Sequence, residues 1–460
     1  MNIVQITPGA GPMYCGNCFR DNALVTELLR QGHSVLMVPL YLPLTLDETD
    51  QTQGVPVFFN GINVYLDQKS SWFRHAPAWI HRLAASPVLL NWASKRVAKT
   101  RAADVGDITV SMLRGEAGNQ ARELYDLINF LKTQLRPDVI CLSNALLVGM
   151  ARRLKSELGT AIACALQGED TFLDALTPKY RDLAWSTLAE RARDVDLFIP
   201  PTRYFGDLMT RRLDLPPSRV RVIYNGINLD GYPEARPSAS GARVSSAAVP
   251  HATAVSAPPP VLGFFARMCR EKGLDTFVEA FILLKERNRI PNLKLKIGGS
   301  CGPSDEPFVN SLRDRLQSKA LLDHVEFHPN VDRTAKLAFL RSLSVFSVPA
   351  LYGEAFGLYV IEALASGVPV VQPRHAAFPE LIELSGGGVT CEPGSPQALA
   401  DAIEKILLDT SHREALAAAA LRSAHEKFTA TRMAAETLGA FAELAAKFGP
   451  SRAQPATLSA

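Results

Sequence analysis

The chain has 460 residues, of which 47% are hydrophobic and 21% charged, which is the composition of an ordinary globular protein. Its length exceeds what one hydrophobic core supports, so we expect two or three domains. The 49 basic and 46 acidic residues leave a formal charge of +3, which argues against nucleic-acid binding by bulk electrostatics.

The amino terminus lacks the basic and then apolar pattern of a signal peptide, and no apolar run is long enough to span a membrane. We therefore expect a cytoplasmic protein. The number of cysteines is odd and most lie inside apolar runs, which is typical of buried, reduced thiols. They are Cys15, Cys18, Cys141, Cys164, Cys269, Cys301 and Cys391.

Short apolar runs alternate with helical patterns along the first half of the chain. The alternation is typical of a parallel sheet with helical crossovers. Two helical patterns stand out, one that continues through 31 and one near 119–133. The predicted strands lie at 2–7, 34–40, 138–143, 161–166, 196–200 and 220–226.

A stretch dense in Ser, Ala and Pro interrupts the alternation at 233–260, and we interpret it as a flexible linker or insertion without function. The alternation then restarts, with strands that begin near 261, 293, 324, 343, 368 and 387, and it ends in Ala-rich helices at about 396–446. The fold class is therefore α/β, with two doubly wound domains that face a central cleft. We divide the chain into a first domain at 1–232, the linker at 233–260, a second domain at 261–428, a helix at 429–446 that returns to the first domain, and a disordered tail at 447–460.

The loop after the first strand is rich in glycine. Gly9, Gly11 and Gly16 precede a helix, so the backbone here can approach a phosphate or sugar closely. Cys15 and Cys18 in the same loop form a C-x-x-C motif, for which a redox pair or half of a zinc site is an alternative use. No second such motif completes a zinc site, so we expect no metal.

A basic and aromatic segment follows. Seven Lys or Arg residues and no acid lie between 68 and 103, interleaved with Trp72, Phe73, Trp79 and Trp92. One interpretation of the stretch from 69 to 101 is a peripheral contact with an anionic membrane surface, at the inner membrane face, or an acceptor site. The other is a pair of surface helices with solvated basic side chains.

Polar residues follow the strand that ends at Leu166. Gln167, Glu169 and Asp170 therefore lie at a carboxyl end of the first sheet, where they can hold an acceptor hydroxyl or a donor sugar. Asp170 is alternatively an N-cap for the next helix.

Two cations follow the strand that opens the second domain. Arg267 and Lys272 lie on the loop after 261–265, just before a helical pattern. A guanidinium fork and an ammonium together suit a diphosphate. A solvated basic loop is the plain alternative.

Glu354 and Glu362 are the most informative residues of the chain. Leu358 and later apolar residues predict a helix at 357–366, so Glu354 lies in its entry loop and Glu362 in its second turn. The N–H groups of the first turn attract phosphate, and the carboxylates suit hydroxyls on either side of it. A nucleotide diphosphate sugar has this arrangement of groups. The alternative is an amphipathic helix with solvated acids.

The segments ARMCREKG at 266–273, PALYGEAFGLYVIEALASGVPVV at 349–371 and GGVTCEPGSPQALADAI at 387–403 resemble the retaining glycosyltransferases called group 1 or family 4, which have the GT-B fold. The segment RVRVIYNGIN at 219–228 is similar to the one that closes the first domain in that family. The resemblance covers about 1–446 and is strongest over 345–405.

The resemblance implies a retaining, hexosyltransferase-type enzyme that needs no metal and no cofactor besides its nucleotide diphosphate sugar donor. Catalysis would rest on Arg267, Lys272 and Glu354, with Glu354 on the transferred sugar and Glu362 on the ribose. The backbone near Ala355, Phe356, Gly357 and Leu358 would contact the diphosphate. The acceptor would be a saccharide, a lipid-linked sugar or a small molecule.

The chain departs from the family near 167. Many members carry a histidine after this strand, whereas Gln167, Gly168, Glu169 and Asp170 stand here. If this departure removes the chemistry, the chain is a catalytically inactive protein that binds nucleotide sugars. A sugar-nucleotide epimerase, which shares the two-domain fold, is a second alternative.

Overall fold

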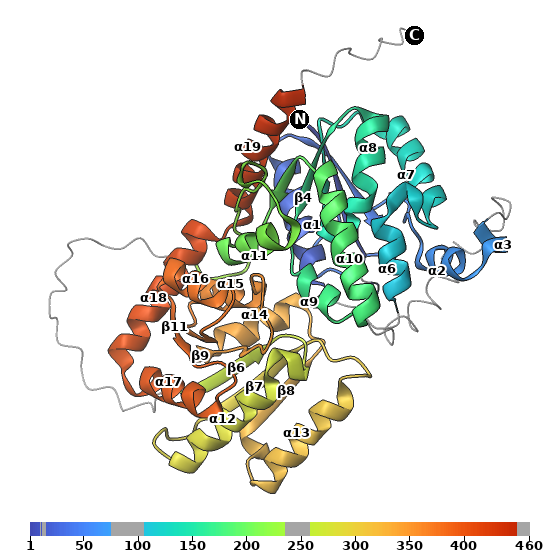
Figure 1. Cartoon of the computed structure of the whole chain (residues 1–460). Coiled ribbons are helices and arrows are strands. Elements are labelled where there is room, and N and C mark those ends of the chain that lie inside the picture. Colours follow the sequence, from blue (N-terminus) through green and yellow to red (C-terminus); the bar gives the residue numbers. More distant parts are fainter. Residues whose placement is uncertain (10, 12–14, 75–104, 235–257, 449–460) are drawn as a thin grey trace, which may run out of the picture. The chain divides into compact units, whose positions relative to one another are not determined.

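The computed structural model describes residues 1–9, 11, 15–74, 105–234 and 258–448 (Figure 1). Contacts between Cα atoms group them into two units. The first contains Met1–Asn228, the short segment Gly353–Phe356 and the chain from Thr429 onward. The second contains Leu229–Tyr352 and Gly357–Phe428. The first unit thus leaves off after Asn228. The sequence analysis places this boundary four residues later, at 232.

The first unit is built on a five-stranded parallel sheet with the order β2-β1-β3-β4-β5. Crossovers on both sides of β1 make it doubly wound. Its strands are β1 (Asn2–Pro8), β2 (Ser34–Leu40), β3 (Val139–Leu142), β4 (Ala161–Ala165) and β5 (Leu197–Ile199). All five lie where the apolar runs predict them.

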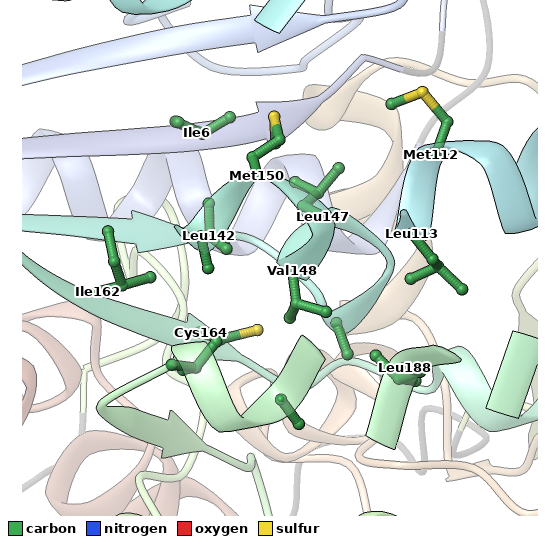
Figure 2. Close-up of a cluster of buried hydrophobic side chains, with 14 of the residues drawn as sticks. Ile6, Met112, Leu113, Leu142, Leu147, Val148, Met150, Ile162, Cys164 and Leu188 are labelled. Carbon is green, nitrogen blue, oxygen red and sulfur yellow. The ribbon is translucent and has the colours of Figure 1, made fainter. Parts of the chain in front are cut away.

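Alternate residues of these strands enter two hydrophobic clusters on opposite faces of the sheet. Ile6, Leu142 and Ile162 pack with Leu147, Val148 and Leu188 on one face, as Figure 2 shows. Ile3, Val139 and Ala163 pack on the other face against α1 (Gly16–Arg30) and α19 (Ala430–Phe448). The remaining helices of this unit are α2 (Gly61–Lys69), α3 (Ser71–Arg74), α6 (Gly106–Leu113), α7 (Ala121–Gln134), α8 (Ala151–Leu158), α9 (Glu169–Asp174), α10 (Pro178–Arg191) and α11 (Arg203–Leu213).

The strand predicted at 220–226 does not form. Arg221 and Ile223 donate backbone hydrogen bonds to Phe198 and Pro200, so the segment runs beside β5 as extended chain. Only Val220 makes a ladder bridge, to Phe198. The apolar alternation is correct, but the pairing is too short to count as a strand.

The second unit is built on a six-stranded parallel sheet with the order β11-β10-β9-β6-β7-β8. The fold-class prediction of two parallel α/β domains is confirmed. The strands are β6 (Val261–Phe265), β7 (Lys294–Gly299), β8 (Val325–Pro329), β9 (Val345–Phe346), β10 (Val370–Pro373) and β11 (Gly388–Cys391). The helices are α12 (Leu274–Arg287), α13 (Glu306–Ser318), α14 (Arg333–Arg341), α15 (Leu358–Ala365), α16 (Phe378–Ser385), α17 (Pro396–Leu408) and α18 (Thr410–Lys427).

Three expectations fall partly or wholly outside the described residues. They are most of the linker at 233–260, most of the basic segment at 69–101, and the tail. Within the described chain, no helix combines the length and the apolar character that crossing a membrane requires.

Candidate functional site

Lys272 is held at the turn between β6 and α12. The turn ends at Gly273, whose φ of 73° lies in the left-handed region. A Cβ atom on Gly273 would lie 1.9 Å from the carbonyl oxygen of Pro349, so only glycine fits this close approach to the loop after β9. Leu351 also donates its backbone N–H to the carbonyl of Glu271 at 2.9 Å. The two loops are therefore fixed to each other at the carboxyl ends of β6 and β9.

The ammonium group of Lys272 lies over two aromatic rings. Its Nζ is 4.9 Å from the ring centre of Tyr352 and 5.0 Å from that of Tyr359. Tyr359 belongs to the first turn of α15, so the structure places Lys272 beside the start of this helix. Cation–π attraction holds the charge there.

The start of α15 confirms the geometry predicted for the glutamate helix. The helix spans Leu358–Ala365, within the predicted range of 357–366. Gly357 precedes it with a φ of 88° and has no side chain to cap the first turn. Gly367 follows the helix with a φ of 71°, as the position after a helix end favours.

Glu362 is held by a lysine that the sequence analysis does not identify. Lys336 of α14 donates to Glu362 Oε1 at 2.9 Å, and the side chains are 11% and 18% exposed. The carboxylate is therefore fixed in place through one oxygen. Oε2 can then accept a hydrogen bond from a ligand hydroxyl.

Arg267 is also paired. Its Nε donates to Asp305 Oδ2 at 3.0 Å and its Nη2 donates to Asp305 Oδ1 at 2.9 Å, a bidentate arrangement. The hydrogen bond with Asp305 raises the pKa of the guanidinium, which stays charged. The Arg267 side chain is 55% exposed and Asp305 only 10%. The guanidinium group that the sequence analysis assigns to a diphosphate thus already binds a carboxylate through Nε and Nη2.

Glu354 and Glu362 fall in different units. Glu354 is in the segment Gly353–Phe356, which groups with the first unit. In that segment the backbone carbonyl of Ala355 accepts a hydrogen bond from Thr202 Oγ1 at 2.9 Å. Thr202 also caps α11 through the N–H of Phe205. A helix cap therefore anchors the residue next to Glu354.

The residues predicted at 167–170 are tied into the first unit. Gln167 Nε2 donates to the carbonyl of Ser143 at 3.0 Å and to Asp21 Oδ1 at 3.4 Å. Glu169 is buried and accepts backbone N–H groups from Ala145 at 2.7 Å and Gln167 at 2.9 Å. Burial raises the pKa of Glu169 to about 7. Glu169 therefore holds two loops, and Gln167 is the more accessible of the two.

The N-cap expected at Asp170 is wrong. Gly168, with a φ of 93°, precedes α9, and Asp170 lies inside its first turn. Asp170 is 8% exposed, and its Oδ1 has no hydrogen-bond partner within the described structure. Burial raises the pKa of this carboxyl. It is the residue of this stretch with unused hydrogen-bonding capacity.

The glycines of the first loop are used for packing. Gly9 donates to the carbonyl of Leu40 at 2.7 Å, and a Cβ atom there would lie 1.4 Å from the carbonyl oxygen of Leu42. Gly11 donates to Pro43 at 3.0 Å. These two amides are thus occupied by the end of β2 and the chain that follows it, whereas Gly16 is exposed at the start of α1.

A buried polar network links the same loop to Gln167. Asp21 is 0% exposed and accepts hydrogen bonds from Thr7 Oγ1 at 2.8 Å and Arg20 Nη1 at 3.0 Å. Arg20 Nε also points at Asn225 Oδ1, at 3.4 Å. Sequence reasoning missed this pair, although adjacent charges inside an apolar helical pattern are a usable signal.

The chain is similar to known glycosyltransferases in sequence and in fold. Residues 250–423 match the family model described as "Glycosyl transferases group 1", and residues 22–230 match "Glycosyltransferase Family 4". A D-inositol 3-phosphate glycosyltransferase from Xylanimonas cellulosilytica is 29% identical over 56% of this chain and 59% of its own length. An uncharacterized glycosyltransferase from Methanocaldococcus jannaschii is 27% identical over 49% of this chain and 54% of its own. The matched part thus spans between half and three-fifths of these relatives.

Solved structures share the fold over nearly the whole chain. Sucrose-phosphate synthase from Thermosynechococcus elongatus matches with a TM-score of 0.67 and 15% identity, over 97% of this chain and 100% of that one. HepE from Anabaena in complex with UDP-glucose matches with a TM-score of 0.64 and 15% identity, over 96% and 100% of the two chains. At this identity the likeness concerns the fold.

Proposed function

The chain belongs to the group 1 and family 4 glycosyltransferases of GT-B fold, and from that premise we propose that it moves a sugar from a nucleotide diphosphate sugar to an acceptor hydroxyl. The anomeric configuration is retained, and the enzyme is of the hexosyltransferase type. The acceptor is a saccharide, a lipid-linked sugar or a small molecule. Support comes from a similar structure that contains UDP-glucose and from relatives named for inositol phosphate.

One observation carries the proposal. Lys272 lies over Tyr352 and Tyr359 at the start of α15, where Gly357 leaves the first turn without a capping side chain. A helix start with a fixed cation beside it favours a diphosphate more than a neutral ligand. Glu362 in the same helix is fixed by Lys336, which suits the ribose hydroxyls of the same ligand.

The chemistry is stabilisation of a leaving group. As the bond between the anomeric carbon and the phosphate oxygen breaks, negative charge grows on the diphosphate. Lys272 stabilises that charge, and Arg267 assists through Nη1, since Nε and Nη2 contact Asp305. The acceptor hydroxyl attacks the same face, and its proton passes to the departing phosphate oxygen. We propose that these cations make a metal ion unnecessary.

Residues of the first unit are proposed to serve the sugar and the acceptor. Glu354 contacts hydroxyls of the transferred sugar, and its position depends on the bond from Thr202 to Ala355. Asp170 has a carboxylate oxygen without a partner within the described structure, so it is the better candidate for an acceptor hydroxyl. Glu169 has a supporting role, because both of its oxygens accept backbone N–H groups.

The test is a panel of UDP-, GDP-, ADP- and dTDP-sugars, first by thermal shift and then by transfer to mixed polyol and saccharide acceptors. We expect Lys272→Met to reduce transfer with the best donor about a hundredfold to a thousandfold, as loss of one stabilising donor does. Lys319→Met is the control, since Lys319 makes a surface ion pair with Glu286. A product of inverted configuration would refute retention, and tight donor binding without transfer to any acceptor would refute the enzyme. Transfer lost on chelation and restored by a divalent cation would refute metal independence.

A further inference from the structure

Cys15 and Cys18 stand three residues apart at the start of α1. Cys15 is the residue before the helix, with extended backbone at φ −121° and ψ 120°, and Cys18 is in the first turn. Side chains at this spacing lie on one face of a helix, about 5–6 Å apart between Cβ atoms. A disulfide needs Cβ atoms about 3.5–4.5 Å apart, so closing it requires Cys15, which lies outside the helical hydrogen bonding, to move towards Cys18. The placement suits an internal disulfide across the first turn.

The two thiols differ in access. Cys15 is partly exposed, whereas Cys18 is 1% exposed. A reagent in solution can therefore reach Cys15 more readily than Cys18, which is buried. A partly exposed attacking thiol next to a buried resolving thiol is the arrangement of a reversible dithiol.

Hydrogen bonds shift the pKa values of the two thiols in opposite directions. The Cys18 thiol lies 3.0 Å from the carbonyl oxygen of Pro8 and also within reach of the Cys15 sulfur. The hydrogen bond from Cys18 and the backbone N–H groups of Cys18 and Asn17 lower the pKa of Cys15. The pKa of Cys18 is raised because it keeps the shared proton. Cys15 is thus the nucleophile and Cys18 the proton donor.

The other cysteines lack this environment. Burial raises the pKa of Cys141, Cys164, Cys269, Cys301 and Cys391. Cys141 and Cys164 occupy neighbouring strands but belong to hydrophobic clusters on opposite faces of the sheet. Cys301 is partly exposed, so it is a suitable internal reference for accessibility without activation.

We propose that Cys15 and Cys18 are a reversible oxidation site that a small-molecule disulfide, such as oxidised glutathione, converts to an internal disulfide. The Cys15 thiolate attacks one sulfur of oxidised glutathione, whose S–S bond breaks and releases a thiolate. The Cys18 thiol then gives its proton to that thiolate and attacks the Cys15 sulfur, which displaces the second glutathione thiolate. The second thiolate takes from the solvent a proton equivalent to the one that Cys15 released when it ionised. Two protein thiols are thus oxidised to one disulfide, and one oxidised glutathione is reduced to two thiols.

Oxidation changes the contacts of two residues at the start of α1. It removes the S–H group that points at Pro8 and the negative charge at the start of α1. The buried pair of Arg20 and Asp21 follows in the next turn, and Asp21 contacts Gln167. This inference does not depend on the proposed sugar transfer, because its readout is the state of the thiols.

The experiment uses the full chain in buffers of defined reduced and oxidised glutathione, quenched by alkylation and read by peptide mass. We expect the peptide with both cysteines to lose the mass of two hydrogen atoms, while the Cys301 peptide remains alkylated. At pH 7, Cys15 in the reduced protein should alkylate about tenfold faster than Cys301 or more, because each unit of pKa changes the thiolate fraction about tenfold.

Two variants distinguish the roles of the thiols. Cys18→Ser should accumulate one glutathione on Cys15, because the resolving thiol is gone. Cys15→Ser should leave Cys18 reduced. The proposal is overturned if the pair stays reduced in every buffer, if Cys301 reacts first, or if Cys15→Ser takes up glutathione as readily as Cys18→Ser.

Discussion

The pair of Lys336 and Glu362 allows a quantitative test of the site. Lys336→Met keeps the length of the side chain and removes its charge, which leaves Glu362 without its partner 2.9 Å away. Breaking a buried ion pair by removing one partner costs about 3–5 kcal/mol. Since the side chains are 11% and 18% exposed, solvent screens part of this, and we expect a loss of about 2 kcal/mol in the free energy of unfolding.

The same change should weaken the binding of the nucleotide. Glu362 is proposed to accept ribose hydroxyls, and hydrogen bonds to charged groups contribute about 1.5–3 kcal/mol. If loss of Lys336 removes half of that, the Kd for the best nucleoside diphosphate rises about fourfold to twelvefold. Isothermal titration calorimetry gives Kd, and urea unfolding gives stability.

A double-mutant cycle decides whether the two residues act together. Lys336→Met, Glu362→Gln and the double variant should show a coupling energy above about 1 kcal/mol in nucleotide binding. Lys319→Met is the matched control, because its pair with Glu286 is on the surface and contributes about 0–1 kcal/mol. Additive effects within about 0.5 kcal/mol, or an unchanged Kd in Lys336→Met, would refute the role given to Lys336.

Three further changes test the surroundings. Burial raises the pKa of Glu123 from 4.5 to about 7, so the folded state holds a proton that the unfolded state loses, and stability should fall by up to about 3 kcal/mol as pH rises from 4.5 to 7. Glu123→Gln should flatten this fall in urea unfolding, and an unchanged pH profile would contradict it. Asp305→Asn should reduce kcat about threefold to tenfold with little change in KM, because Arg267 loses a charged partner that orients it in the transition state. Equal or faster turnover would contradict this and show that Asp305 restrains Arg267. Gly273→Ala should destabilise the chain by at least about 2 kcal/mol, since its Cβ would meet Pro349, and an unchanged Tm would show that the turn can shift.

The sequence predicts the strands well because buried parallel strands are continuous apolar runs. The strands at 34–40 and 370–373 lie within or at the predicted runs. The segment 220–226 has the same composition, yet it pairs through one bridge only. An apolar composition indicates that a segment is buried and extended. A β-strand also requires a neighbouring strand long enough to form several consecutive backbone hydrogen bonds with it.

The sequence predicts those parts of the site that depend on neighbouring residues, and it misses those that depend on residues distant in the chain. The positions of Lys272 and of the helix start follow from local signals, a glycine and an apolar period. Lys336 and Asp305 lie far along the chain from the groups they hold, and nothing local marks them as partners. The segment that contains Glu354 groups with the first unit, and Thr202 donates a hydrogen bond to Ala355 in that segment; only the folded chain shows either feature.

The last helix has a consequence for how the chain folds during synthesis. Met433 and Phe441 of α19 complete the cluster that covers Ile3, Val139 and Ala163 on one face of the first sheet. That face lacks part of its cover until the ribosome has made the whole second unit. Synthesis of the first unit thus begins before that of the second unit and ends after it. A fragment that ends near 228 should therefore expose an apolar face and aggregate. Co-expression with 429–448 should restore its solubility.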